Sequence, residues 1–110
     1  MEKTERRRSP RKALGCEVTL RHALSGMEFQ GFAKDVSTLG IYVEADGDFV
    51  KGDFVNLRFR LPEGTTYLEA SGMVVRKEEI GEGKYGFGVE FVEMEEWVLS
   101  QIWHFVMHGK

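Results

Sequence analysis

The chain has few residues that could cross-link the fold or break its secondary structure. Among 110 residues there are one cysteine and two prolines. The lone Cys16 excludes an internal disulfide and is typical of a reducing compartment, so we expect a cytoplasmic protein. The longest apolar stretch is interrupted by Ser100, Gln101 and His104, which leaves it too short and too polar to span a bilayer. The charged start lacks the apolar core of a signal peptide. We therefore expect no membrane insertion.

Signatures of catalysis are also missing. The sequence has no catalytic carboxylate pair, no phosphate-cradling glycine loop and no nucleophile elbow, and Cys16 has no histidine partner in a catalytic pattern. His104 and His108 have the spacing of two metal ligands on a helix, but no cysteine or acidic residue lies near them in sequence. Their place near the end of a predicted helix suits the helix dipole instead. We therefore expect that the protein is not an enzyme and that it binds no metal and no cofactor.

Charge is distributed unevenly along the chain. Residues 1–12 contain six basic and two acidic residues, a net charge of +4, whereas the remainder contains nine basic and sixteen acidic residues, a net charge of −7. The acidic part would repel a long polyanion, so we expect no DNA or RNA partner. A compact ligand with few phosphates remains compatible with the basic segment.

The abundant pattern is alternation of apolar and polar residues, which is typical of half-buried strands. We expect strands at about 13–21, 28–34, 41–43, 55–61, 67–77 and 84–91, the last two joined by a hairpin at residues 81–83. Because no parallel βαβ spacing is present, the predicted fold is mainly β, a small six-stranded antiparallel barrel.

After Phe91 the apolar period becomes helical and predicts a C-terminal helix at about 93–108, lying against an opening or edge of the barrel. Trp97 belongs to its apolar stripe and is expected in the core, whereas an exposed Trp103 would indicate an interface. The predicted organisation is a flexible basic arm at 1–12 followed by one domain at 13–110.

Two short clusters carry the functional prediction: residues 6–11 (RRRSPR) and residues 35–40 (DVSTLG). Arginine binds phosphate and the O6/N7 edge of guanine in bidentate fashion. Asp35 can accept the N–H groups of guanine, Ser37 can reach a phosphate oxygen, and Gly40 leaves space for the backbone. The simpler interpretations are a solvated basic tail and a plain turn. Together the clusters indicate a small, anionic, guanine-bearing ligand.

The same residues resemble a known family. Arg7 and Arg11 fit RxxxR, and Asp35, Ser37 and Gly40 fit DxSxxG, in the order and spacing of PilZ domains. The resemblance covers nearly the whole chain and implies a bacterial receptor for cyclic di-GMP that passes its signal to a partner protein, the arginine arm becoming ordered on the ligand. The alternative is a PilZ-fold interaction module that works without ligand.

Three further residues are candidates at the ligand. Arg6 precedes the motif, and a third guanidinium there would favour a stacked pair of ligands. Arg8 lies between Arg7 and Arg11, and the resemblance implies no separate role for it. Arg76 lies on the long strand, where PilZ domains often place a bulky residue near the ligand, although a solvent-facing strand arginine is the simpler interpretation. The segment at 86–91 (GFGVEF) also resembles the closing strand of that family.

Overall fold

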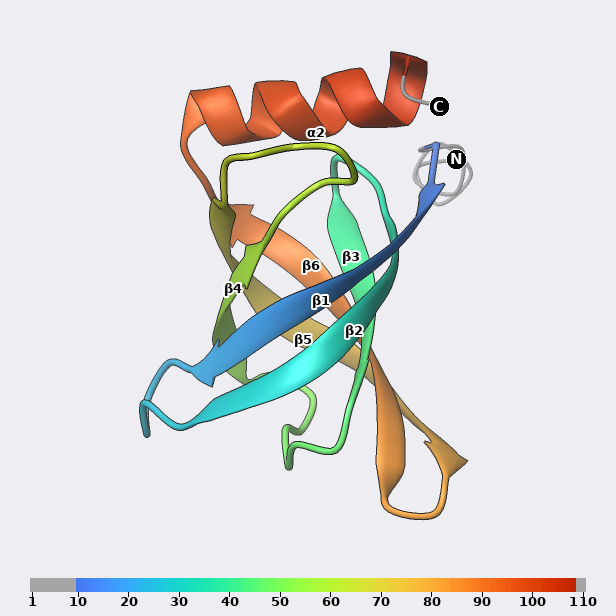
Figure 1. Cartoon of the computed structure of the whole chain (residues 1–110). Coiled ribbons are helices and arrows are strands. Elements are labelled where there is room, and N and C mark those ends of the chain that lie inside the picture. The colour runs from blue at the N-terminus through green and yellow to red at the C-terminus, as the bar shows by residue number, and fades with distance from the viewer. Residues whose placement is uncertain (1–9, 109–110) are drawn as a thin grey trace, which may run out of the picture.

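The computed structural model describes residues 10–108, in which six strands are followed by one helix (Figure 1). The elements are β1 (Lys12–His22), β2 (Glu28–Val36), β3 (Gly40–Ala45), β4 (Phe54–Phe59), β5 (Leu68–Gly81), β6 (Lys84–Glu93) and α2 (Glu96–His108). The strands form a closed antiparallel barrel, so the predicted fold class is confirmed. No helix within the described range has the length and apolar content needed to cross a membrane.

The barrel closes through two pairings between strands that are not consecutive in sequence. Around the barrel the order is β1-β2-β3-β6-β5-β4, and β4 pairs back onto β1. Val18 lies opposite Phe59 in the β1–β4 pair, and Ile41 lies opposite Val89 in the β3–β6 pair. Strands are paired all round the barrel, although β4 pairs with β5 only as far as Met73 whereas β5 continues to Gly81.

Alternation along each strand fills the barrel interior. On β4 the side chains of Val55, Leu57 and Phe59 are buried, while Asn56 and Arg58 between them are exposed. This is the period of two that the sequence displays most clearly at this strand.

Helix α2 lies across one end of the barrel (Figure 1) and buries Val98 and Ile102. The prediction that Trp97 is a core residue is wrong, because its side chain is 45% exposed. Successive helical residues are about 100° apart, so a helix that turns Val98 inward directs Trp97 toward the rim. There the indole Nε1 donates a hydrogen bond to Glu95 at 2.6 Å.

Phe49 lies in the loop between β3 and β4 and belongs to the buried core. This loop is at the end of the barrel opposite α2 (Figure 1). Phe49 is 1% exposed and makes edge-on contacts with Phe29 at 5.1 Å and Phe87 at 5.5 Å between ring centroids. His22 stacks on it at 6.0 Å. A loop residue thus completes the core that the strands begin.

We expect Phe49→Ala to lower the free energy of unfolding by about 3–5 kcal/mol, the range for removing a buried phenylalanine ring. Urea denaturation monitored by circular dichroism measures this loss. Phe54→Ala is the matched control, because Phe54 is 53% exposed and its removal should change stability by less than about 1 kcal/mol. Equal losses in the two variants would contradict the role given to Phe49.

Candidate functional site

A tight turn joins β2 to β3 and is built around the hydroxyl of Ser37. The Ser37 oxygen accepts the backbone N–H groups of Leu39 at 3.0 Å and Gly40 at 3.2 Å. The N–H of Ser37 in turn donates to the carbonyl of Gly40 at 2.8 Å. Ser37 is completely buried, so its first role is to fix the turn, as short hydroxyl side chains commonly do.

Gly40 is required by the approach of β6. A Cβ atom at this position would overlap the carbonyl oxygen of Val89, which lies on the neighbouring strand. A hydrogen bond also joins the turn to β6: Phe91 donates its N–H to the Leu39 carbonyl at 2.8 Å. Glycine here therefore serves barrel closure, in addition to lining the surface beside the turn.

Arg11 lies over this turn and joins the two sequence clusters. Its Nε and Nη2 atoms lie 2.7 and 2.6 Å from Asp35 Oδ1, and its Nη1 lies 3.4 Å from the Ser37 oxygen. The register of β1 and β2 explains why Arg11 lies near Asp35 and Ser37. Lys12, at the start of β1, is paired with Val36, at the end of β2, so the neighbours of these two residues lie close together. The Arg11 and Asp35 side chains remain 47% and 36% exposed, so the pair stays accessible to a ligand.

Arg11, Asp35, Ser37 and Gly40 line a groove of about 850 Å³ that continues over the outer face of β3, β6 and β5. Tyr42, Arg76, Glu78, Gly88 and Glu90 also line it. The Arg76 guanidinium carbon lies 5.3 Å from the centroid of the Tyr42 ring, and the Tyr42 hydroxyl donates to Glu78 at 2.5 Å. Arg76 is thus in the same groove as the turn.

Two glycines of β6 allow these side chains to lie flat on the sheet. A Cβ atom at Gly86 would overlap the hydroxyl of Tyr42, and one at Gly88 would lie 3.2 Å from the Cβ of Arg76. Glycine in a strand often marks such a close approach. The result is a shallow surface bearing an aromatic ring, a guanidinium and a carboxylate.

Burial and the hydrogen bond to the Glu78 carboxylate raise the pKa of Tyr42 from 10 to about 12. The phenol therefore remains a neutral hydrogen-bond donor across the physiological range. Cys16 lies elsewhere, on β1, and desolvation raises the pKa of its thiol, which favours the protonated, unreactive form.

The structure brings together Arg11, Asp35, Ser37, Gly40 and Arg76, whereas the predicted residues Arg6, Arg7 and Arg8 lie outside the described range. Tyr42 and Glu78, which also line this groove, were not among the predicted residues. A usable signal was present: glycines at alternate positions 86 and 88 of a strand leave room for a large side chain on the facing strand. Among residues 10–108, no three His, Cys, Asp or Glu side chains gather in a way that could hold a metal ion.

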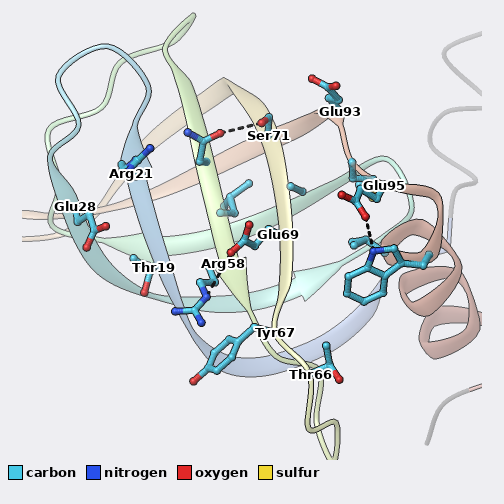
Figure 2. Close-up of a pocket in the computed structure, with 16 residues that line it drawn as sticks. Thr19, Arg21, Glu28, Arg58, Thr66, Tyr67, Glu69, Ser71, Glu93 and Glu95 are labelled. Carbon is cyan, nitrogen blue, oxygen red and sulfur yellow. Dashed lines mark hydrogen bonds and ion pairs between the residues drawn. The ribbon is translucent and has the colours of Figure 1, made fainter.

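A second groove, of about 1000 Å³, lies over β1, β4, β5 and the start of α2 (Figure 2). Arg58 stacks on Tyr67 at 4.1 Å from the ring centroid and lies 3.6 Å from Glu69. Four carboxylates and two arginines line this groove, which has none of the motif residues: Glu28, Glu69, Glu93, Glu95, Arg21 and Arg58. Its acidic lining makes it a poor site for an anion.

The sequence matches the PilZ domain family over residues 5–108. The chain belongs to this family. The resemblance identified in the sequence is therefore confirmed, and the Asp35–Gly40 turn occupies the junction of β2 and β3 in a PilZ barrel. No curated protein sequence matches the chain.

Solved structures show the same fold at low sequence identity. Bacillus subtilis inhibitor of motility MotI/DgrA is 23% identical with a TM-score of 0.77, covering 91% of this chain and 49% of that one. The PilZ domain of Escherichia coli YcgR with c-di-GMP is 13% identical with a TM-score of 0.70, covering 92% and 88%. The PilZ domain of CeSA from a cellulose-synthesizing bacterium is 17% identical with a TM-score of 0.64, covering 89% and 95%. The present chain spans about half the length of MotI/DgrA.

The Tyr42 contacts predict a late-titrating phenol. Tyr42→Phe should remove a step at about pH 12 from the absorbance titration of the three tyrosines, and Tyr67→Phe should leave that step in place. Because the folded-state pKa lies above the unfolded value of 10, the stabilisation from the neutral phenol is complete below pH 10 and is lost as the pH rises through about 12. A Tyr42→Phe difference centred near pH 10 would contradict the contact with Glu78.

Proposed function

We propose that this PilZ domain is a receptor for cyclic di-GMP and not an enzyme, with Arg7, Arg11, Asp35 and Ser37 at the ligand. The observation that carries the proposal is the clasp of Arg11 on Asp35 and Ser37 at one end of an open groove. A guanidinium at this place supplies donors for a phosphate or a guanine edge. Arg11 Nε and Nη2 both lie close to Asp35 Oδ1, and we assign the other carboxylate oxygen, Oδ2, to a guanine N–H.

The groove alone has the wrong charge for a ligand with two phosphates. Its described lining has two arginines, Arg11 and Arg76, against three carboxylates, Asp35, Glu78 and Glu90. The missing positive charge is available in the sequence immediately before Arg11, at residues 6–8. We therefore assign the phosphates chiefly to Arg6 and Arg7 of this segment together with Arg11, and Arg8 and Arg76 are secondary contacts.

The contrast between the fixed turn and the arginines at residues 6–8 suggests how a signal is produced. Asp35, Ser37 and Gly40 are fixed by the turn and the barrel, and we propose that ligand phosphates draw residues 6–8 onto this fixed surface. Ordering a segment costs conformational entropy, which several charge-assisted hydrogen bonds must offset. The newly arranged surface is then recognised by a partner protein in the bacterial cytoplasm. The alternative is an interaction module that works without ligand. The pairing of Asp35 with Arg11 supports it, because the two charged side chains already satisfy each other.

Isothermal titration with cyclic di-GMP tests the receptor function. Arg7→Ala and Arg11→Ala should each weaken binding by at least about 1–3 kcal/mol, roughly 5- to 150-fold in Kd. Asp35→Ala should also reduce the preference for cyclic di-GMP over cyclic di-AMP. Raised salt should weaken binding, because exposed arginine–phosphate pairs are screened.

Arg58→Ala is the matched control, since this arginine lies in the second groove and should leave Kd unchanged. Circular dichroism of each variant excludes loss of the fold as the cause. Absence of binding heat for the unaltered chain would favour the ligand-independent module, and full affinity in both Arg7→Ala and Arg11→Ala would remove the assigned site.

The stoichiometry depends on Arg6. Three consecutive arginines are present where the family motif needs one, so we expect two stacked ligands per chain, with the additional guanidinium on the second. Arg6→Leu should then lower the calorimetric stoichiometry from two to one without abolishing binding. A saturation value of one ligand for the unaltered chain would contradict this role of Arg6 while leaving the first site standing.

A further inference from the structure

Two exposed aromatic rings line the groove over β1, β4, β5 and the start of α2 (Figure 2). The side chains of Tyr67 and Trp97 are 47% and 45% exposed. Tyrosine and tryptophan are enriched where proteins contact one another, because each offers a large apolar face together with a polar group. A groove that exposes two such rings is a candidate interaction surface.

One of the two rings, Tyr67, is already covered by an arginine of this chain. The guanidinium carbon of Arg58 lies 4.1 Å from the centroid of the Tyr67 ring, and Nε of Arg58 lies 3.6 Å from Oε2 of Glu69. An aromatic face and a carboxylate are the two contacts that a planar guanidinium favours. This part of the groove therefore shows that its chemistry suits arginine.

The other ring, Trp97, has the same kind of surroundings without an arginine. Its indole Nε1 donates a hydrogen bond to Glu95 at 2.6 Å, which fixes the ring beside a carboxylate. Glu93 also lines this end of the groove, toward α2 (Figure 2). Among residues 10–108, no lysine or arginine is stacked on the indole. Tryptophan is the side chain whose ring attracts a cation most strongly.

The surplus negative charge of the groove lies at this same end. The carboxylate of Glu69 is already next to an arginine. Glu28 lies opposite Arg21 in the register of β1 and β2, so these two charges can offset each other. Within the described part of the chain, Glu93 and Glu95 form no ion pair. Two carboxylates beside an exposed indole complement one added cation.

We propose that this groove binds an arginine of a partner protein, with the guanidinium stacked on Trp97 and paired with Glu93 and Glu95. A guanidinium makes both contacts at once, whereas the ammonium of lysine has no flat face to stack. The groove has a volume of about 1000 Å³, which leaves room for the partner chain on either side of the arginine. Uncharged polar side chains along the groove can hydrogen-bond the backbone of that segment: Thr19, Asn56, Thr66 and Ser71.

The proposed docking groove is separate from the groove of Arg11 and Asp35, because the two have no lining residue in common. The proposal therefore does not depend on cyclic di-GMP binding. We expect a weak contact for a single arginine, since exposed ion pairs and exposed cation–π contacts each contribute little.

NMR of the indole N–H groups tests the proposal, because the chain has two tryptophans and Trp103 serves as an internal reference. The full chain, without cyclic di-GMP, is titrated to about 10 mM with a blocked pentapeptide that has one arginine among glycine and serine. The Trp97 resonance should shift to saturation while the Trp103 resonance stays in place, and Trp103→Phe assigns the two signals.

The same pentapeptide with citrulline in place of arginine is the control ligand, because citrulline has the shape of arginine without its charge. It should bind at least about fivefold more weakly. Equal affinity for the two peptides, or no saturable shift of the Trp97 resonance, would overturn the proposal. Arginine amide that binds as tightly as the pentapeptide would identify a free small cation as the occupant and would overturn the protein segment.

Substitution of the two carboxylates tests the assigned residues. Glu93→Gln and Glu95→Gln should each weaken pentapeptide binding by about two- to fivefold, the scale of an exposed ion pair. Glutamine next to the indole can still accept its N–H, so the ring stays in place. Glu82→Gln is the matched control, because it removes the same charge in the hairpin between β5 and β6 and should leave affinity unchanged. Full affinity in the Glu93→Gln, Glu95→Gln double variant would overturn the site.

Discussion

The buried hydroxyl of Ser37 supports two features of this protein, the closure of its barrel and the groove proposed to bind the ligand. By accepting the N–H groups of Leu39 and Gly40, it turns the chain sharply from β2 into β3. The turn delivers Gly40 against the Val89 carbonyl, where only glycine fits, and β3 then pairs with β6. The same oxygen lies 3.4 Å from Arg11, so one short segment supports both the fold and the site.

The two grooves differ in chemistry more than in size. Around Arg11 and Asp35, the sheet is flattened by glycines so that the Tyr42 ring and the Arg76 guanidinium lie along it. In the other groove the exposed rings of Tyr67 and Trp97 stand among carboxylates. Both grooves need additional positive charge to attract an anion. The arginines at residues 6–8 shortly precede Arg11 in the sequence, so they can supply this charge to the groove that Arg11 lines.

The barrel and its helix were predictable because alternation and helical spacing report directly which side chains turn inward. The motif residues on the turn were also found, because their spacing is local. Phe49 was missed because a loop residue enters the core without any periodic signal. Trp97 was misassigned because it lies at the edge of the apolar stripe, and Tyr42 gains its role only from glycines on a strand distant in sequence.

Amide hydrogen exchange with and without cyclic di-GMP tests the central claim most directly, namely that an arginine arm closes on a fixed turn. Ligand should slow exchange in residues 6–8, with Arg11 and the barrel strands nearly unchanged because their contacts already exist. Slow exchange in residues 6–8 before ligand is added would contradict the ordering step. Protection confined to the second groove, around Arg58 and Trp97, would contradict the site itself.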